Sequence, residues 1–360
     1  MRLALALTLG TSLWACGDGH HAKPDAPASM IDAPADVAID TPIDGNPLMP
    51  ATLFDTGLCV DRACTQISAG ISAYTPSYPL WADGAGKGRW MQLPPGGQID
   101  TTDPDHWVFP VGTKFWKEFV AKDAGGNDVR VETRFIWRIA NNGVPNDWFY
   151  VAYQWNATED DTMAVPFGQP DANGTTHDIP NRIECLTCHG NLPSSFILGF
   201  GALQLDTAAA TGDIAIDDVV ANGWLTQNPA GAAAPHYPLP GAGTSAQDAI
   251  GYLHANCGHC HNPTSKVYSD QGVVMQLRLT TDSLSSLSTT PVYQTAVDHD
   301  ATMPAGGLTK LIVRNQPDQS LVMFRFESAP SSSYHMPKLG SEVMDPTGDA
   351  TLRDWITNIQ

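Results

Sequence analysis

The chain has 360 residues, of which 42% are hydrophobic and 16% charged, a balance that predicts two or three folded domains and excludes disorder throughout. Acidic residues outnumber lysine and arginine by 38 to 19. The resulting net charge of −19 argues against a nucleic-acid-binding protein, because a phosphate backbone would be repelled. The seven cysteines are an odd number, so one thiol of an exported chain needs a separate explanation.

The first 15 residues have the pattern of a signal peptide. Arg2 is followed by the apolar run 3–9, which is too short to span a bilayer. The stretch Leu13-Trp14-Ala15-Cys16 resembles the lipobox of bacterial lipoproteins, in which the chain is cut before the cysteine and that cysteine is acylated. Cys16 is therefore the predicted lipidation site, with an ordinary secretory signal as the alternative. No later stretch reaches about 18 uninterrupted apolar residues, so we expect a lipid anchor and no transmembrane helix.

Residues 16–50 are predicted to be a disordered tether. From 17 to 50 the chain contains six Pro, six Ala, six Asp, one Lys and no aromatic residue. The prolines stiffen this segment and the like charges extend it, so it would hold the folded part away from the lipid. The folded body keeps a charge of −15, which is −19 without the +1 of Arg2 and the −5 of the tether.

Residues 51–165 are predicted to form an all-β domain, a sandwich or barrel that contains a three-strand meander. Between 129 and 138, apolar or threonine side chains alternate with arginine and glutamate, which is the period of a strand. The turns 125–127 and 141–143 flank this strand, and further strands are expected at 115–120 and 148–155. Seven of the ten tryptophans fall in this domain and predict an aromatic core, with a polymer-binding surface as the alternative.

Two short motifs carry the chemistry. Cys185-Leu186-Thr187-Cys188-His189 and Cys257-Gly258-His259-Cys260-His261 both have the pattern Cys-x-x-Cys-His, which is typical of covalent haem c attachment. One helical turn places both thiols along one porphyrin edge for thioether bonds, while the histidine ligates the iron. We therefore predict two covalent haem c groups on Cys185, Cys188, Cys257 and Cys260, with His189 and His261 as the proximal iron ligands.

Other interpretations of these cysteines are a thioredoxin-like redox pair and a zinc site of four Cys and two His. Export, together with a histidine directly after the second cysteine of each motif, favours haem. Cys59 and Cys64 are predicted to form a disulfide in an oxidising compartment, with a metal pair as the alternative. The cysteines then divide into one lipidated, two bridged and four on haem.

The chain after residue 165 is predicted to form mostly α-helical c-type cytochrome domains. A capping-box pattern at 245–248 begins a helix that leads into the second motif. An amphipathic helix ends the chain, with apolar residues at helical spacing in Leu352, Trp355, Ile356 and Ile359. The first haem segment and a connector occupy 166–243, and a second haem domain occupies 244–360; the connector, 228–243, is rich in Ala, Pro and Gly.

The sixth iron ligand distinguishes an electron carrier from a haem enzyme, because a methionine thioether fills the sixth coordination position, whereas an open position admits small ligands. Met336, which precedes the C-terminal helix, is the predicted distal ligand of the second haem, with a core methionine as the alternative. No methionine lies between the two motifs, so Met303 is the candidate for the first haem. The alternatives for the distal position of the first haem are an open site and the side chains of His177, His236 and Met163.

These features are similar to those of a family of secreted dihaem c-type cytochromes. The resemblance covers most of residues 52–360 and rests on both motifs and on the stretches 78–85, 107–113, 252–257 and 336–340. The last stretch reads Met-Pro-Lys-Leu-Gly, where the family has a second proline in place of Lys338. The resemblance implies two haems and electron transfer, and it names no substrate.

The sequence therefore predicts a membrane-anchored dihaem cytochrome that carries electrons in the bacterial periplasm or at the cell surface. Its acidic body would dock on a redox partner with a basic surface. Gly17 in place of an aspartate resembles the sorting signal for the outer membrane. The alternatives are a dihaem peroxidase or oxidase that reacts at the first haem, and a polymer-binding β domain with accessory haems.

Overall fold

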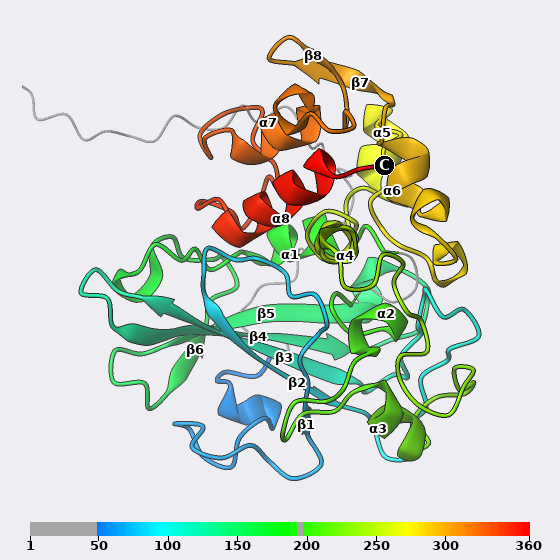
Figure 1. Cartoon of the computed structure of the whole chain (residues 1–360). Coiled ribbons are helices and arrows are strands. Elements are labelled where there is room, and N and C mark those ends of the chain that lie inside the picture. Colours follow the sequence, from blue (N-terminus) through cyan, green and yellow to red (C-terminus); the bar gives the residue numbers. More distant parts are fainter. Residues whose placement is uncertain (1–48, 193–196) are drawn as a thin grey trace, which may run out of the picture. The chain divides into compact units, whose positions relative to one another are not determined.

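The computed structural model of the chain describes residues 49–192 and 197–360. Its centre is one antiparallel sheet of six strands, in which each strand pairs with the next in chain order (Figure 1). The strands are β1 (Ser72–Ala73), β2 (Gly86–Gln92), β3 (Lys114–Lys122), β4 (Asp128–Arg138), β5 (Trp148–Trp155) and β6 (Thr162–Ala164). The predicted signal peptide, the Cys16 lipidation site and nearly all of the tether lie outside the described residues.

The predicted three-strand meander is formed by β3, β4 and β5, and an aspartate closes each of its two turns. Asp123 Oδ1 accepts hydrogen bonds from the backbone nitrogens of Gly125 and Asn127, both at 2.8 Å. In the second turn, Asp147 Oδ2 accepts from the backbone nitrogens of Asn142 and Gly143, both at 2.6 Å. Such local carboxylate bonds satisfy turn amides that have no partner in the sheet.

Both faces of this sheet are covered, so neighbouring residues of a central strand enter different cores. Trp116 and Val151 pack with Leu53 and Leu58 of the chain before the sheet. Phe115 and Tyr150 pack on the other face with residues of the chain after the first motif, which contains α2 (Ala202–Leu205) and α3 (Ile216–Ala221). Four of the seven tryptophans are at most 3% exposed, namely Trp107, Trp116, Trp148 and Trp155. The aromatic side chains therefore build the core of this region.

The C-terminal part has a core of its own around two helices of equal length. Here α4 (Ser245–Asn256) packs against α8 (Pro346–Thr357), and α7 (Leu321–Glu327) packs on α8 as well (Figure 1). The shorter helices are α1 (Arg182–His189), α5 (Lys266–Gln271) and α6 (Pro291–Thr295), and β7 (Asp300–Ala305) pairs with β8 (Leu308–Lys310). The 3₁₀ helices are η1 (Phe54–Thr56), η2 (Pro145–Asp147), η3 (Ala172–Gly174), η4 (Thr281–Ser283), η5 (Leu287–Thr289) and η6 (Pro317–Gln319).

The predicted fold class is wrong. We expected a β-sandwich or barrel followed by mostly α-helical cytochrome domains, whereas the structure has one six-stranded antiparallel sheet and only 25% helix. The sequence marks two helices clearly, α4 and α8, and the prediction assumed that the chain around them is mostly helical as well. That chain contains stretches that cannot form helices: residues 222–244 hold four prolines and four glycines and contain no helix. Coil and short helices, not a second sheet, cover the sheet.

The two helices that the sequence marked are present with the expected kind of cap. The Thr244 side chain accepts a hydrogen bond from the Ala246 nitrogen at the start of α4, and Asp345 accepts from the Thr347 nitrogen at the start of α8. The capping residue of α4 is Thr244, one residue before the predicted box.

The β region and the C-terminal helices meet through side chains of the segment before β2. The Trp81 nitrogen donates to Asn256 Oδ1 at 2.6 Å, and the Trp81 ring nitrogen donates to the Val343 carbonyl at 2.8 Å. Residues 49–360 form one compact unit. The boundaries that we predicted inside it, after 165 and after 243, stay predictions. Within the described residues, no helix is long and apolar enough to cross a membrane.

Candidate functional site

The first Cys-x-x-Cys-His motif lies on α1, a helix with a complete N-terminal cap. Asn181 Oδ1 accepts from the nitrogens of Ile183 and Glu184 at 2.9 and 3.0 Å, and Glu184 Oε2 accepts from the Asn181 nitrogen at 2.8 Å. This cap fixes where the helix begins, so Cys185 and Cys188 lie one turn apart and His189 is its last residue. The three motif side chains thus share one side of the helix.

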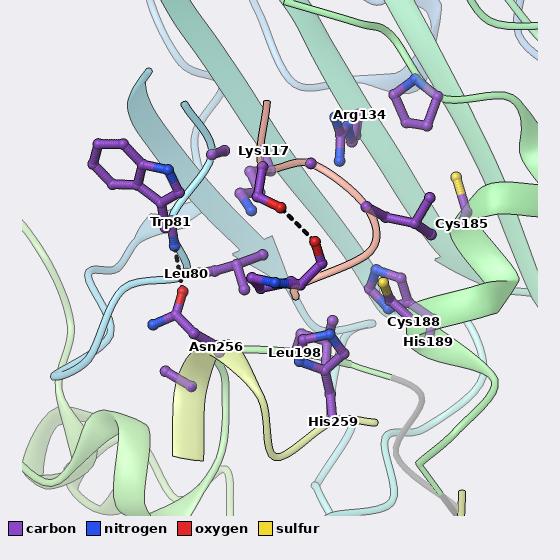
Figure 2. A pocket seen from close by; sticks show the side chains of 18 of the residues that line it. Leu80, Trp81, Lys117, Arg134, Cys185, Cys188, His189, Leu198, Asn256 and His259 are labelled. Carbon is purple, nitrogen blue, oxygen red and sulfur yellow. Dashed lines mark hydrogen bonds between the residues drawn. The ribbon is translucent and has the colours of Figure 1, made fainter. Parts of the chain in front are cut away.

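These three side chains line a cavity of about 590 Å³ (Figure 2). Its walls come from strands β2 to β5, from α1, from residues 197–204 and from residues 252–259, and the loop 335–345 completes it. The Tyr150 ring of β5 lies 5.3 Å from the His189 ring, measured between centroids. A pocket of this size, lined by aromatic and apolar side chains together with eleven charged ones, suits a large ligand that has both apolar and charged parts.

The second motif forms a turn directly after α4. The nitrogens of Cys260 and His261 donate to the Cys257 carbonyl at 3.1 and 2.9 Å. Gly258 is required here, because a Cβ at this position would lie 2.6 Å from the His254 carbonyl oxygen and 2.8 Å from Arg278 Cα. Of the five motif residues only His259 lines the cavity.

The side chains of Cys257, Cys260 and His261 are half-buried, and that of His259 is buried. Burial raises the pKa of the Cys257 and Cys260 thiols to about 12 and lowers the pKa of His261 to about 4. His261 Nδ1 is buried and makes no hydrogen bond within the described residues.

Asn191, two residues after the first motif, connects the two motifs. Its side-chain nitrogen donates to the Thr187 carbonyl at 2.7 Å and lies 3.9 Å from Cys260 Sγ. Its side-chain oxygen accepts from the Lys266 nitrogen at 3.2 Å. Asn191 is 8% exposed, so these bonds are made inside the protein. The two motifs, far apart in the sequence, therefore meet in space.

Several buried polar atoms of the cavity wall have no partner within the described residues. They are Tyr150 Oη, His259 Nδ1 and Arg278 Nε. Tyr150 and His259 are only 4% and 7% exposed. A buried donor or acceptor without a partner costs about 1–3 kcal/mol, so such atoms around one cavity indicate that a bound group with polar edges belongs there.

Of the predicted distal ligands, the structure brings Met336 to the cavity of the first motif. The Met336 nitrogen donates to the Arg325 carbonyl at 3.0 Å, and His335 beside it lies 2.8 Å from the Ser328 carbonyl, so the loop is anchored. Met303, in β7, is 45% exposed and does not line this cavity, and Met163 is 65% exposed. The sequence assigned Met336 to the second motif, and in the structure it lines the cavity that is also lined by the first motif and by His259 of the second.

The two histidines that competed for the first iron are engaged elsewhere. His177 Nε2 lies 2.7 Å from Glu132 Oε1, although the His177 side chain also lines the cavity. His236 Nε2 lies 2.8 Å from Asp217 Oδ1, and its Nδ1 lies 2.8 Å from the Ala230 carbonyl oxygen. Neither side chain is free to turn toward a metal without giving up these contacts.

The structure also shows the state of the other cysteines and bears on the zinc alternative. Cys59 and Cys64 are joined by a disulfide with a Cα–Cα distance of 4.9 Å. The four motif cysteines are separate thiols. Across residues 49–192 and 197–360, no three His, Cys, Asp or Glu side chains gather in a metal-binding arrangement. The motif residues are thus not arranged as one tetrahedral zinc site.

Neither the family models nor the curated proteins nor the solved structures contain a significant match to this chain. The first motif fits a haem, because its thiols and its histidine line one large cavity whose wall holds unpartnered polar atoms. The second motif does not fit in the same way, because Cys257, Cys260 and His261 do not line that cavity.

Sequence reasoning missed the parts of the site that the fold assembles. Tyr150 and Asn191 carried no motif signal, although Asn191 follows the first motif by two residues. Arg134 was placed correctly opposite the apolar face of its strand, but alternation alone does not show that this polar face lines a cavity.

Proposed function

We propose that the protein is a c-type cytochrome that binds haem covalently at the first motif and carries electrons. The observation that supports this most strongly is the position of Cys185, Cys188 and His189 on the wall of one cavity of about 590 Å³. A helical turn between two thiols, followed directly by a histidine, is the arrangement that haem c attachment needs. The unpartnered polar atoms of the same wall add support.

Each residue of this site has a role in the proposal. Cys185 and Cys188 would hold the haem through thioether bonds, and His189 would ligate the iron with Tyr150 packed against its ring. Met336 would be the sixth ligand, because it lines the same cavity. A bound haem supplies one-electron redox chemistry, and the protein tunes it through these ligands and through burial.

A second haem at Cys257, Cys260 and His261 is part of the proposal, and it rests on the motif alone. The contact between Asn191 and Cys260 would bring two such groups close together inside one body, which suits an electron carrier. The export signal, the lipid anchor at Cys16 and the bacterial cell envelope as location belong to the same proposal. The body charge of −15 favours a basic redox partner.

The decisive experiment is a count of covalent haems. The full chain is produced together with a cytochrome c maturation system, and haem staining on a denaturing gel is combined with intact mass. We expect two haems in the wild type and one in each of the variants Cys185→Ala/Cys188→Ala and Cys257→Ala/Cys260→Ala. The matched control Cys59→Ala/Cys64→Ala removes two cysteines outside the motifs and should keep both haems. A wild-type protein without covalent haem would overturn the proposal, and a wild type with a single haem would overturn the second site.

A dihaem peroxidase or oxidase that reacts at the first haem is the second candidate. Peroxide would need an open iron position, and in this protein Met336 is the residue that would close it. Stopped-flow mixing of reduced protein with hydrogen peroxide distinguishes the two functions. Rapid, repeated oxidation of the haem by peroxide would favour the enzyme over the carrier.

A further inference from the structure

Three basic residues face one another across neighbouring strands of the sheet. Arg89 in β2 pairs in register with Lys117 in β3, and Lys117 pairs in register with Arg134 in β4. All three side chains line the cavity of the first motif. Figure 2 shows Lys117 and Arg134 on the strands that form one of its walls, with Cys185 and Cys188 on the neighbouring helix. We call Arg89, Lys117 and Arg134 the cationic row.

Such a row is unfavourable by itself. Like charges directly opposite each other on adjacent strands destabilise a sheet, and burial makes their repulsion stronger. Arg89 is only 8% exposed. Burial holds the pKa of Lys117 well below its ordinary value, and the charges of Arg89 and Arg134 lower it further. An anion in the cavity would relieve this repulsion and favour the charged form of Lys117.

Among the described residues, only one member of the row forms an ion pair with a carboxylate. Arg134 pairs with Glu132 at 2.6 Å, and Glu132 is shared with His177. Among the described residues, Lys117 and Arg89 form no ion pair with any carboxylate, and the Lys117 ammonium lies 4.7 Å from the centre of the Phe119 ring. Only Arg134 of the row is therefore paired with a carboxylate, although six carboxylates line the same cavity: Asp83, Asp105, Asp178, Glu184, Glu342 and Asp345.

We infer that the cationic row binds the two propionate carboxylates of the haem attached to Cys185 and Cys188. This inference rests on the proposed function. The two carboxylates would give Arg89 and Lys117 the anionic partners that they lack among the described residues. Guanidinium groups bind a carboxylate through two parallel hydrogen bonds, and an ammonium adds a point charge, so the row offers the donors that two carboxylates require.

The test uses the haem-loaded full chain and the variants Lys117→Met and Arg89→Gln. Lys122→Met is the matched control, because Lys122 is on the same strand, is exposed and pairs with Asp128. Resonance Raman spectroscopy reads the propionate bending bands, and a spectroelectrochemical titration reads the midpoint potentials. Both row variants should shift the propionate bands and lower one midpoint potential, because a positive charge beside the haem is lost. The control should change neither. The same shifts should persist in the Cys257→Ala/Cys260→Ala background, which identifies the haem of the first motif.

The outcomes separate this inference from the proposed function. Haem staining is done first, and a wild-type protein without haem would overturn both the proposed function and the assignment of the cationic row. If haem is present and the propionate bands of both row variants match the wild type, only the row assignment is overturned. A further arm titrates succinate into the haem-loaded wild type and Lys117→Met. Binding of succinate that depends on Lys117, with unchanged propionate bands, would assign the row to a free carboxylate ligand and overturn its assignment to the haem.

Discussion

The side-chain amide of Asn191 lies 3.9 Å from the Sγ atom of Cys260, although 69 residues separate them in the chain. The same amide donates to the Thr187 carbonyl inside the first motif, so one side chain contacts both Cys-x-x-Cys-His motifs. Because Asn191 is buried, its hydrogen-bonding groups have little access to water. This contact fixes the position of one motif relative to the other.

We expect Asn191→Ala to lower the free energy of unfolding by about 1–3 kcal/mol, the cost of leaving buried partners such as the Thr187 carbonyl unsatisfied. Urea unfolding of the haem-loaded protein, followed by the haem absorbance, measures this. Asn228→Ala is the control, because Asn228 is exposed. Equal midpoints for the two variants would show that the Asn191 contact does not hold the motifs together.

A second prediction concerns the sixth ligand. Met336 lines the cavity of the first motif, whereas Met303 is exposed on β7. In the haem-loaded protein, Met336→Ala should therefore remove the methionine charge-transfer band from the oxidised spectrum and add a high-spin signal in EPR. Met303→Ala should leave both spectra as in the wild type. Loss of the band in Met303→Ala alone would reverse the assignment.

Local sequence signals predicted individual elements well, since they depend on neighbouring residues. The period of β4, the turns on each side of it and the capping pattern before α4 are examples, and each lies within a few residues of its prediction. The sequence also predicted that Cys185 and Cys188 lie side by side on one helix, because one helical turn brings residues three apart together.

Relationships across the fold could not be predicted in this way. Nothing in the sequence of β2, β3 and β4 gives their register, and only the register brings Arg89, Lys117 and Arg134 side by side. Met336 was assigned to the nearer motif in the chain, and the sequence does not show that its loop lines one cavity with Cys185, Cys188 and His189. The fold class was wrong for the same reason, because strongly helical ends do not determine how the chain between them packs.

The pH dependence of stability provides a third prediction. Burial lowers the pKa of Lys87 to about 8 from an ordinary value of 10.5, and the charges of Arg89 and Arg134 contribute. Between these two values the unfolded chain holds a proton that the folded protein has released. The unfolding free energy of the wild type should therefore rise with pH across this window, and the destabilising effect of the charged lysine is fully present below about pH 8.

The variant Lys87→Met has no titrating group at this position. Its unfolding free energy should exceed that of the wild type at about pH 7, and this difference should shrink as the pH rises to about 10. Urea unfolding at both pH values measures the difference between the two proteins, in which the titration of other groups cancels. A difference that stays constant over this range would contradict the lowered pKa of Lys87.

The last prediction tests how the β region is joined to α4. Gly251 lies in the middle of α4, and a Cβ there would lie 2.1 Å from Cε1 of Tyr78, which belongs to the chain before β2. Alanine is the better helix former by about 1 kcal/mol, so helix propensity alone predicts that Gly251→Ala stabilises the protein. We expect the opposite, a loss of about 1–3 kcal/mol, because the Tyr78 ring must move away from the helix. Thermal unfolding measures the sign. The double variant Gly251→Ala/Tyr78→Leu removes the ring and should recover part of the loss, whereas a stabilised Gly251→Ala protein would show that Tyr78 does not pack on this helix.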